Sequence, residues 1–141
     1  MHKLFNFLQY LYFPFYVLTI FYIVKGSIIQ FNLEDVGFGI LCMGIAFGFS
    51  SMGDITKISK KEKKLFSNEK RFNRIVVYLV VIGFTTMIVT ILFISQKWIK
   101  NNAMGEQFYQ LGLNCSPLII AVFFSLKQLI DKRQYFNLHN E

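Results

Sequence analysis

The sequence has few charged residues, few prolines and almost no cysteine or histidine. Asp, Glu, Lys and Arg make up 16% of its 141 residues, against roughly a quarter in an ordinary soluble domain. Two cysteines are too few for a disulfide scaffold. A hydrophobic share of 54% excludes intrinsic disorder, which requires a polar and charged chain. A soluble protein of this length has too little interior for so many apolar side chains, so we predict an integral membrane protein.

Residues that carry chemistry are equally scarce. His2 and His139 lie outside the hydrophobic stretches, while Cys42 and Cys115 fall in different ones, where we interpret them as small buried hydrophobes. The chain contains neither a nucleophile elbow of the form GxSxG nor a phosphate-binding Walker loop. We therefore predict no enzymatic activity, no metal site and no cofactor.

Four windows without charge define the predicted fold: residues 4–24, 36–53, 75–96 and 107–126. Each is close to the ~20 residues that a helix needs to cross ~30 Å of hydrocarbon. A membrane β-barrel would instead need short alternating segments, at least about eight of them. The predicted fold class is all-α: an integral membrane bundle of four transmembrane helices, forming a single membrane domain over residues 1–141.

The distribution of Lys and Arg predicts the orientation. If the N-terminus is inside, twelve basic residues lie on the inner side, and only Lys25, Lys97 and Lys100 lie outside. Such an excess on short inner segments is the normal pattern of cytoplasmic loops, so we predict an N-in/C-in topology. Frequent Phe, Ile, Lys and Asn are typical of AT-rich bacterial genomes, so we expect a multi-pass protein of the cell membrane, in particular the bacterial inner membrane.

The second window carries two faces of small residues. At 100° per residue, one face holds Gly37, Gly44, Gly48 and Ser51, and the nearly opposite face holds Gly39, Cys42, Ala46 and Ser50. Small side chains let helix backbones approach closely in lipid. We predict that one face packs inside the bundle and the other against a second copy, which would make the protein a homo-oligomer.

A polar stripe runs along the fourth window. Its members fall within about 60° of one another at the helical period: Gln107, Gln110, Asn114, Ala121, Ser125 and Gln128. Hydrocarbon offers their amides no hydrogen-bond partner, so they must face protein or water. Two interpretations stay open: the stripe bonds to neighbouring helices, or several copies turn it inward to line a pore that a bend at Pro117 gates.

Residues 54–74 form the most polar segment, with eight basic and three acidic residues. The cations are Lys57, Lys60, Lys61, Lys63, Lys64, Lys70, Arg71 and Arg74. Read as one helix, the segment gathers Ile55, Ile58, Leu65 and Phe72 on one side and the cations on the other. This pattern favours a cytoplasmic surface helix whose cations contact anionic lipid headgroups. The alternative is a solvated loop, and nucleic acid is not favoured because stacking aromatics are lacking.

Two classes of function follow from these observations. We predict a small polytopic membrane protein that forms a homo-oligomeric pore, as a channel or a membrane-permeabilising effector. The alternative is a non-conducting interaction or regulatory subunit that binds a membrane or cytoplasmic protein. An ion- or proton-coupled transporter is not favoured, because such proteins usually need an ionisable residue inside the membrane and none lies within the four windows.

Overall fold

The computed structural model describes residues 9–29, 31–100 and 102–139. It is 88% helical, and the part of the chain that it describes contains no strand. The named elements are α2 (Tyr12–Val24), the π-helical turn η1 (Lys25–Ile29), α3 (Leu33–Ser50), α4 (Lys60–Phe66), α5 (Glu69–Lys100) and α6 (Ala103–Leu138). Tyr12–Ile29, α3, α5 and α6 are each long and apolar enough to cross a membrane. The predicted all-α class with four such helices is therefore confirmed.

The predicted windows differ from these helices mainly at their ends. Positions 4–8 of the first window lie outside the described residues, and its helix continues past Lys25 to Ile29. α3 starts earlier than predicted because the Asn32 side chain caps it, accepting a 3.0 Å hydrogen bond from the Glu34 N–H. α5 and α6 extend far beyond the windows 75–96 and 107–126. Charged residues end an apolar window, but most of them are good helix formers and do not end a helix.

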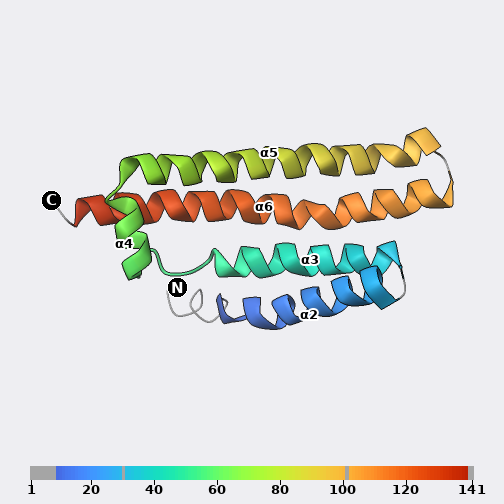
Figure 1. Cartoon of the computed structure of the whole chain (residues 1–141), viewed down its shortest axis with the longest axis horizontal. Helices are drawn as coiled ribbons and strands as arrows, with labels where there is room; N and C mark the ends of the chain where they lie inside the picture. Colours follow the sequence, from blue (N-terminus) through green and yellow to red (C-terminus); the bar gives the residue numbers. More distant parts are fainter. Residues whose placement is uncertain (1–8, 30, 101, 140–141) are drawn as a thin grey trace.

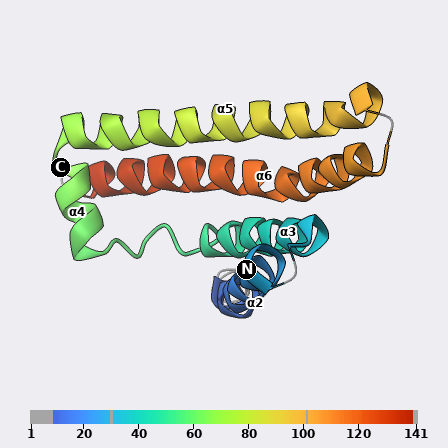
Figure 2. The same ribbon diagram turned by 45° about the vertical axis from the view of Figure 1, so that its right-hand side comes forward.

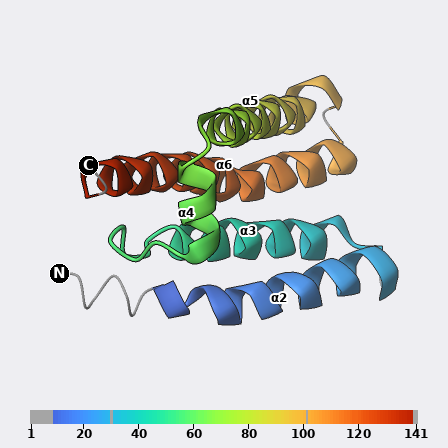
Figure 3. The same cartoon turned by 60° about the vertical axis from the view of Figure 1, so that its left-hand side comes forward.

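The four long helices lie side by side in one row. α5 packs on α6, α6 on α3, and α3 on α2, as Figures 1 and 3 show. Among the described residues, no other pair of these four helices is in contact. Figure 2 shows α2 turned out of the plane of the other three. The predicted bundle has the form of an open row: among the four long helices, α3 and α6 each have two neighbours, whereas α2 and α5 have one.

The helices differ in length, and this difference shapes one end of the molecule. At 1.5 Å per residue, α3 is about 27 Å long, whereas α5 and α6 are about 48 and 54 Å long. Most of the extra length lies where α4 crosses the row (Figure 1). We call this region, residues 53–74 and 126–139, the α4 end. The opposite end, with the connections from α2 to α3 and from α5 to α6, is the turn end.

The orientation in a membrane can be tested with reporter fusions. We expect fusions at Ser67 and at the C-terminus to report the cytoplasm, and fusions at Asn32 and Asn102 to report the outside. The reason is that basic residues beside membrane spans are retained on the inner side, and they gather at the α4 end. Paired alkaline phosphatase and fluorescent-protein fusions measure the side. A cytoplasmic signal at Asn102 would contradict the topology.

Candidate functional site

One small face of α3 packs closely against α6. A Cβ atom built on Gly44 would lie 2.5 Å from the backbone nitrogen of Leu118 and 2.8 Å from the carbonyl carbon of Pro117. A Cβ atom on Gly37 would lie 2.8 Å from Nδ2 of Asn114. A side chain at Gly44 would separate the two backbones, so this glycine permits the close approach of α3 and α6, whereas Gly37 makes room for the side chain of Asn114.

The opposite small face of α3 packs against α2. A Cβ atom on Gly39 would lie 2.7 Å from Cγ1 of Ile23 and 3.1 Å from its backbone nitrogen. Cys42 and Ala46 are only 2% and 3% exposed, and Ser50 lines a cleft that this helix shares with the start of α2. Helices of the same chain thus cover most of both faces; the exception is Gly48 on the first face, where an added Cβ atom would have nothing within 4 Å.

The polar stripe of α6 divides into two parts. Gln107 and Gln110, near the turn end, are exposed. Ala121 is 1% exposed, the Ser125 hydroxyl is hydrogen-bonded to that of Ser51 on α3, and Gln128 Nε2 donates a 3.1 Å hydrogen bond to the Gly53 carbonyl. Together with Asn114, which lies over Gly37, these residues turn toward α3 and its C-terminal extension. Four of the six stripe residues therefore turn toward α3 or its C-terminal extension, and two of them, Ser125 and Gln128, are hydrogen-bonded there.

Pro117 lies inside α6 without ending it. Proline has no N–H, so the carbonyl four residues earlier, that of Leu113, loses its usual helical partner. The Ser116 hydroxyl donates a 2.7 Å hydrogen bond to this carbonyl. Such substitution by a neighbouring hydroxyl is how membrane helices tolerate proline. Ser116 thus satisfies the carbonyl that Pro117 leaves without a partner, and α6 continues as one helix past Gly44.

An aromatic cluster holds α4 against the ends of α5 and α6. Phe66 of α4 lies with its ring centroid 6.0 Å from that of Phe72 on α5 and 5.8 Å from that of Phe136 on α6. Phe66 and Phe72 are 3% and 5% exposed. Tilted and edge-on aromatic pairs at such distances add to the free energy of burial. The cluster forms a small core at the α4 end, beyond the apolar windows.

Polar contacts surround this core. Lys132 of α6 donates a 2.7 Å hydrogen bond to Oε1 of Glu62 on α4, and the Ser59 N–H donates a 2.7 Å bond to Oε2 of the same carboxylate. Partial burial by itself raises the pKa of Glu62, but these hydrogen bonds and the charge of Lys132 outweigh it, so the pKa lies below its ordinary value. Arg133 stacks 4.1 Å over the Phe72 ring and lies 4.0 Å from the carboxylate of Glu69.

The structure corrects the prediction of one surface helix over residues 54–74. α4 ends before Ser67, and α5 starts anew, with Asn68 accepting a 3.1 Å bond from the Arg71 N–H. The apolar anchors are Phe66 and Phe72, whereas Ile55 of the predicted face is 39% exposed. The sequence contained a signal for the true start: Ser59-x-x-Glu62 is a capping box, which here satisfies both terminal donors. A capping box marks the start of a helix, so a box at Ser59 argues against one continuous helix over residues 54–74.

The predicted lipid-contacting cations all lie on the surface. The structure exposes each of Lys57, Lys60, Lys61, Lys63, Lys64, Lys70, Arg71 and Arg74, which we call the basic surface. Two acids of the same segment, Glu62 and Glu69, are instead paired with Lys132 and Arg133 of α6. Positive charge therefore dominates the outward side of the α4 end.

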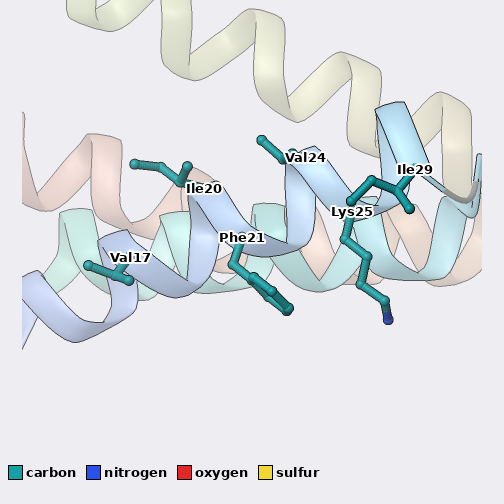
Figure 4. Close-up of a pocket in the computed structure, with 6 residues that line it drawn as sticks. All are labelled: Val17, Ile20, Phe21, Val24, Lys25 and Ile29. Carbon is teal, nitrogen blue, oxygen red and sulfur yellow. The ribbon is translucent and has the colours of Figure 1, made fainter.

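A shallow concave surface of about 590 Å³ runs along α2 and η1 (Figure 4). It is lined by Val17, Ile20, Phe21, Val24, Lys25 and Ile29, all from this one helical segment. The side chains do not converge, because Lys25 points away from Ile20 and Val24, and its Nζ lies 3.0 Å from the Asp35 carboxylate. This surface offers apolar contact but no polar group directed at a ligand.

Within the described ranges, no three His, Cys, Asp or Glu side chains come close enough together to hold a metal ion. The geometry thus defines a helical protein with four candidate membrane helices, a polar seam between α3 and α6, and a basic surface at the α4 end. No family model, curated protein or solved structure matches the chain.

Two matched glycine substitutions test the seam between α3 and α6. We expect Gly44→Ala to destabilise the protein by about 1–3 kcal/mol, because its Cβ atom would meet backbone atoms that cannot rotate away. Gly48→Ala serves as the control, since its Cβ atom would have nothing within 4 Å. Unfolding of the detergent-solubilised variants, followed by circular dichroism, measures the difference. Equal stability of the two variants would contradict the packing described.

Acid should release α4. The pKa of Glu62 is lowered on folding, so its contacts stabilise the docked state above the ordinary pKa of about 4.3 and lose this effect as the pH falls through the lowered value. We expect a fluorophore attached at Ser67, with the native cysteines replaced, to report docked α4 at neutral pH and a progressive loss of docking as the pH falls below the ordinary pKa of a glutamate. The Glu62→Gln variant should lack this transition. An identical titration of both proteins would contradict the role of the carboxylate.

Proposed function

We propose that the protein is a non-conducting membrane subunit that docks or regulates another protein, the alternative left open by the sequence. The single observation that carries this proposal is that most of the polar stripe of α6 faces α3 of the same chain. Asn114, Ser125 and Gln128 contact α3 or its extension within one chain. Side chains committed to such a seam hold helices together, at about 0.6 kcal/mol for each interhelical hydrogen bond.

A pore would require a different arrangement of the same residues. Turning the stripe toward a lumen between copies would break the bond between Ser125 and Ser51 and the one from Gln128 to the Gly53 carbonyl. It would also separate α6 from Gly44, where the backbones are closest. The Gly53 carbonyl would then lose its partner and the Ser51 hydroxyl would keep only its bond to the Phe47 carbonyl, which is costly in hydrocarbon. These costs favour the non-conducting class.

The edge helices supply surface for a partner in the membrane. In the described part of the chain, α2 and α5 each contact only one of the other long helices. Their outer sides carry large exposed apolar side chains, among them Phe13, Phe21, Phe84 and Leu92. We propose that one of these edges binds a helix of the partner protein in the bacterial inner membrane, with the α4 end in the cytoplasm. Self-association remains a prediction, which the mass of the purified protein tests.

Cysteine accessibility and ion flux distinguish the two classes. The native cysteines are replaced, and single cysteines are placed at Asn114, Ala121 and Ser125 of proteoliposome-reconstituted protein. We expect all three positions to be protected from a small water-soluble thiol reagent, because the seam excludes water, and we expect the liposomes to stay tight to ions. A cysteine at the exposed position Ser67 is the control for reagent activity.

Labelling at all three seam positions together with a change in conductance would overturn the proposal. That outcome would instead support the homo-oligomeric pore. Protected positions in leaky liposomes would also contradict it, because the conduction would then follow a path elsewhere in the molecule.

A further inference from the structure

An apolar groove lies on one face of the helix row. α3 and α5 do not contact each other, so α6 between them forms a floor with Leu118 and Val122. Phe47 of α3 stands on one side, and Leu79 and Ile82 of α5 stand on the other. The groove has a volume of about 310 Å³. In a membrane this space must be filled by something from the bilayer.

The lining of the groove suits hydrocarbon. Two hydroxyl groups reach it, those of Thr86 and Ser125. Thr86 donates to the carbonyl of Gly83 at 2.9 Å, and Ser125 lies 2.9 Å from the Ala121 carbonyl and is also bonded to Ser51. Both hydroxyls are therefore satisfied inside the protein. A polar occupant would find no free donor and would lose its own hydration, whereas an acyl chain loses nothing.

α4 crosses the same face of α6 on which the groove lies. Lys132 and Phe136 follow Leu118 by fourteen and eighteen residues, which places them within about 40° of it around the helix. These two residues are the ones that contact Glu62 and Phe66 of α4. The groove and α4 therefore lie on the same side of α6, and Val122 of the groove is ten residues, about 15 Å, from Lys132.

Two cations of the basic surface are candidates for a headgroup contact on this side of α6. Arg71 precedes Ile82 by eleven residues and so lies within about 20° of it around α5. On α4, Lys63 lines a cleft with Tyr135 and His139, toward the tip of α6. Lys61 is about 200° away from Lys63 around the helix, so it lies on the side of α4 away from that cleft. The structure exposes both Lys61 and Arg71.

We propose that this groove is a binding site for an anionic phospholipid of the leaflet at the α4 end. One acyl chain lies between α3 and α5 over Val122, and the headgroup phosphate lies against Lys61 and Arg71. The apolar groove alone would accept any lipid. Lys61 and Arg71 are both exposed, whereas Glu62 is paired with Lys132, so the charge that these two cations present to the headgroup is positive and selects an anionic one. The inference is independent of whether the protein conducts ions or binds another protein.

Tryptophan quenching by brominated lipid tests the site. Trp98 is the sole tryptophan, so Trp98→Phe provides a silent background. Phe47→Trp places a reporter in the groove. Val81→Trp places a second reporter on α5, between the groove residues Leu79 and Ile82 in the chain. Val81 is 55% exposed and does not line the groove, so this variant is the control. Both are reconstituted in phosphatidylcholine vesicles that contain a minor share of phosphatidylglycerol with brominated chains.

We expect severalfold stronger quenching at position 47 than at position 81, because the anionic lipid is enriched in the groove. When the bromine is carried by phosphatidylcholine instead, the two reporters should be quenched alike. Adding Lys61→Ala and Arg71→Ala should abolish the enrichment. Lys70→Ala with Arg74→Ala removes the same charge from another side of α5 and should leave the enrichment unchanged.

Equal quenching at the two positions by the anionic lipid would overturn the proposal. So would enrichment that both double substitutions reduce equally, since general attraction to the charged surface would then be sufficient. Native mass spectrometry of the unmodified chain provides a second measurement. We expect it to retain phosphatidylglycerol in preference to phosphatidylcholine, and a lack of preference would also count against the site.

Discussion

The rest of the structure depends on the close packing of α3 against α6. Hydrocarbon gives helices no hydrophobic reason to associate, so contact must come from dispersion and hydrogen bonds at short range. Gly44 permits that range, and the bond between Ser51 and Ser125 adds a polar contact. Within the described residues, α2 joins the row only through α3, and α5 joins it only through α6 among the long helices. Loss of this seam would divide the protein into two helix pairs.

The α4 end is a consequence of unequal helix lengths. α3 stops at Ser50, whereas α5 and α6 continue well beyond it, so the chain must cross α6 to reach the start of α5. α4 makes this crossing. Its Phe66 packs in the aromatic core with Phe136, and its Glu62 forms an ion pair with Lys132. Because Glu62 is paired with Lys132, it does not neutralise the exposed lysines around it. The internal packing thereby determines the electrostatic character of the outer surface.

An open row offers surfaces that a closed bundle would conceal. The groove between α3 and α5 exists because these helices share α6 as a neighbour without touching each other. The outer sides of α2 and α5 are likewise uncovered by other helices of the chain. The seam, the groove and the edges share few residues, Ser125 being common to the seam and the groove, so the proposals about lipid binding, partner binding and conduction rest on largely different side chains. Each proposal therefore stands on its own evidence.

The sequence by itself determined the all-α class, the four apolar helices and the two small faces of α3, because side-chain hydropathy and the period of 3.6 residues are local properties. It also located the seam residues Asn114, Ser125 and Gln128, since amides and hydroxyls cannot face lipid. Periodicity identifies a face but not its neighbour. Only the tertiary structure decided that α2 covers Gly39 and α6 covers Gly44, and that Phe66 and Phe136 meet at the α4 end. These pairings depend on which backbones approach within contact distance, and residues seventy positions apart carry no local signal of that approach.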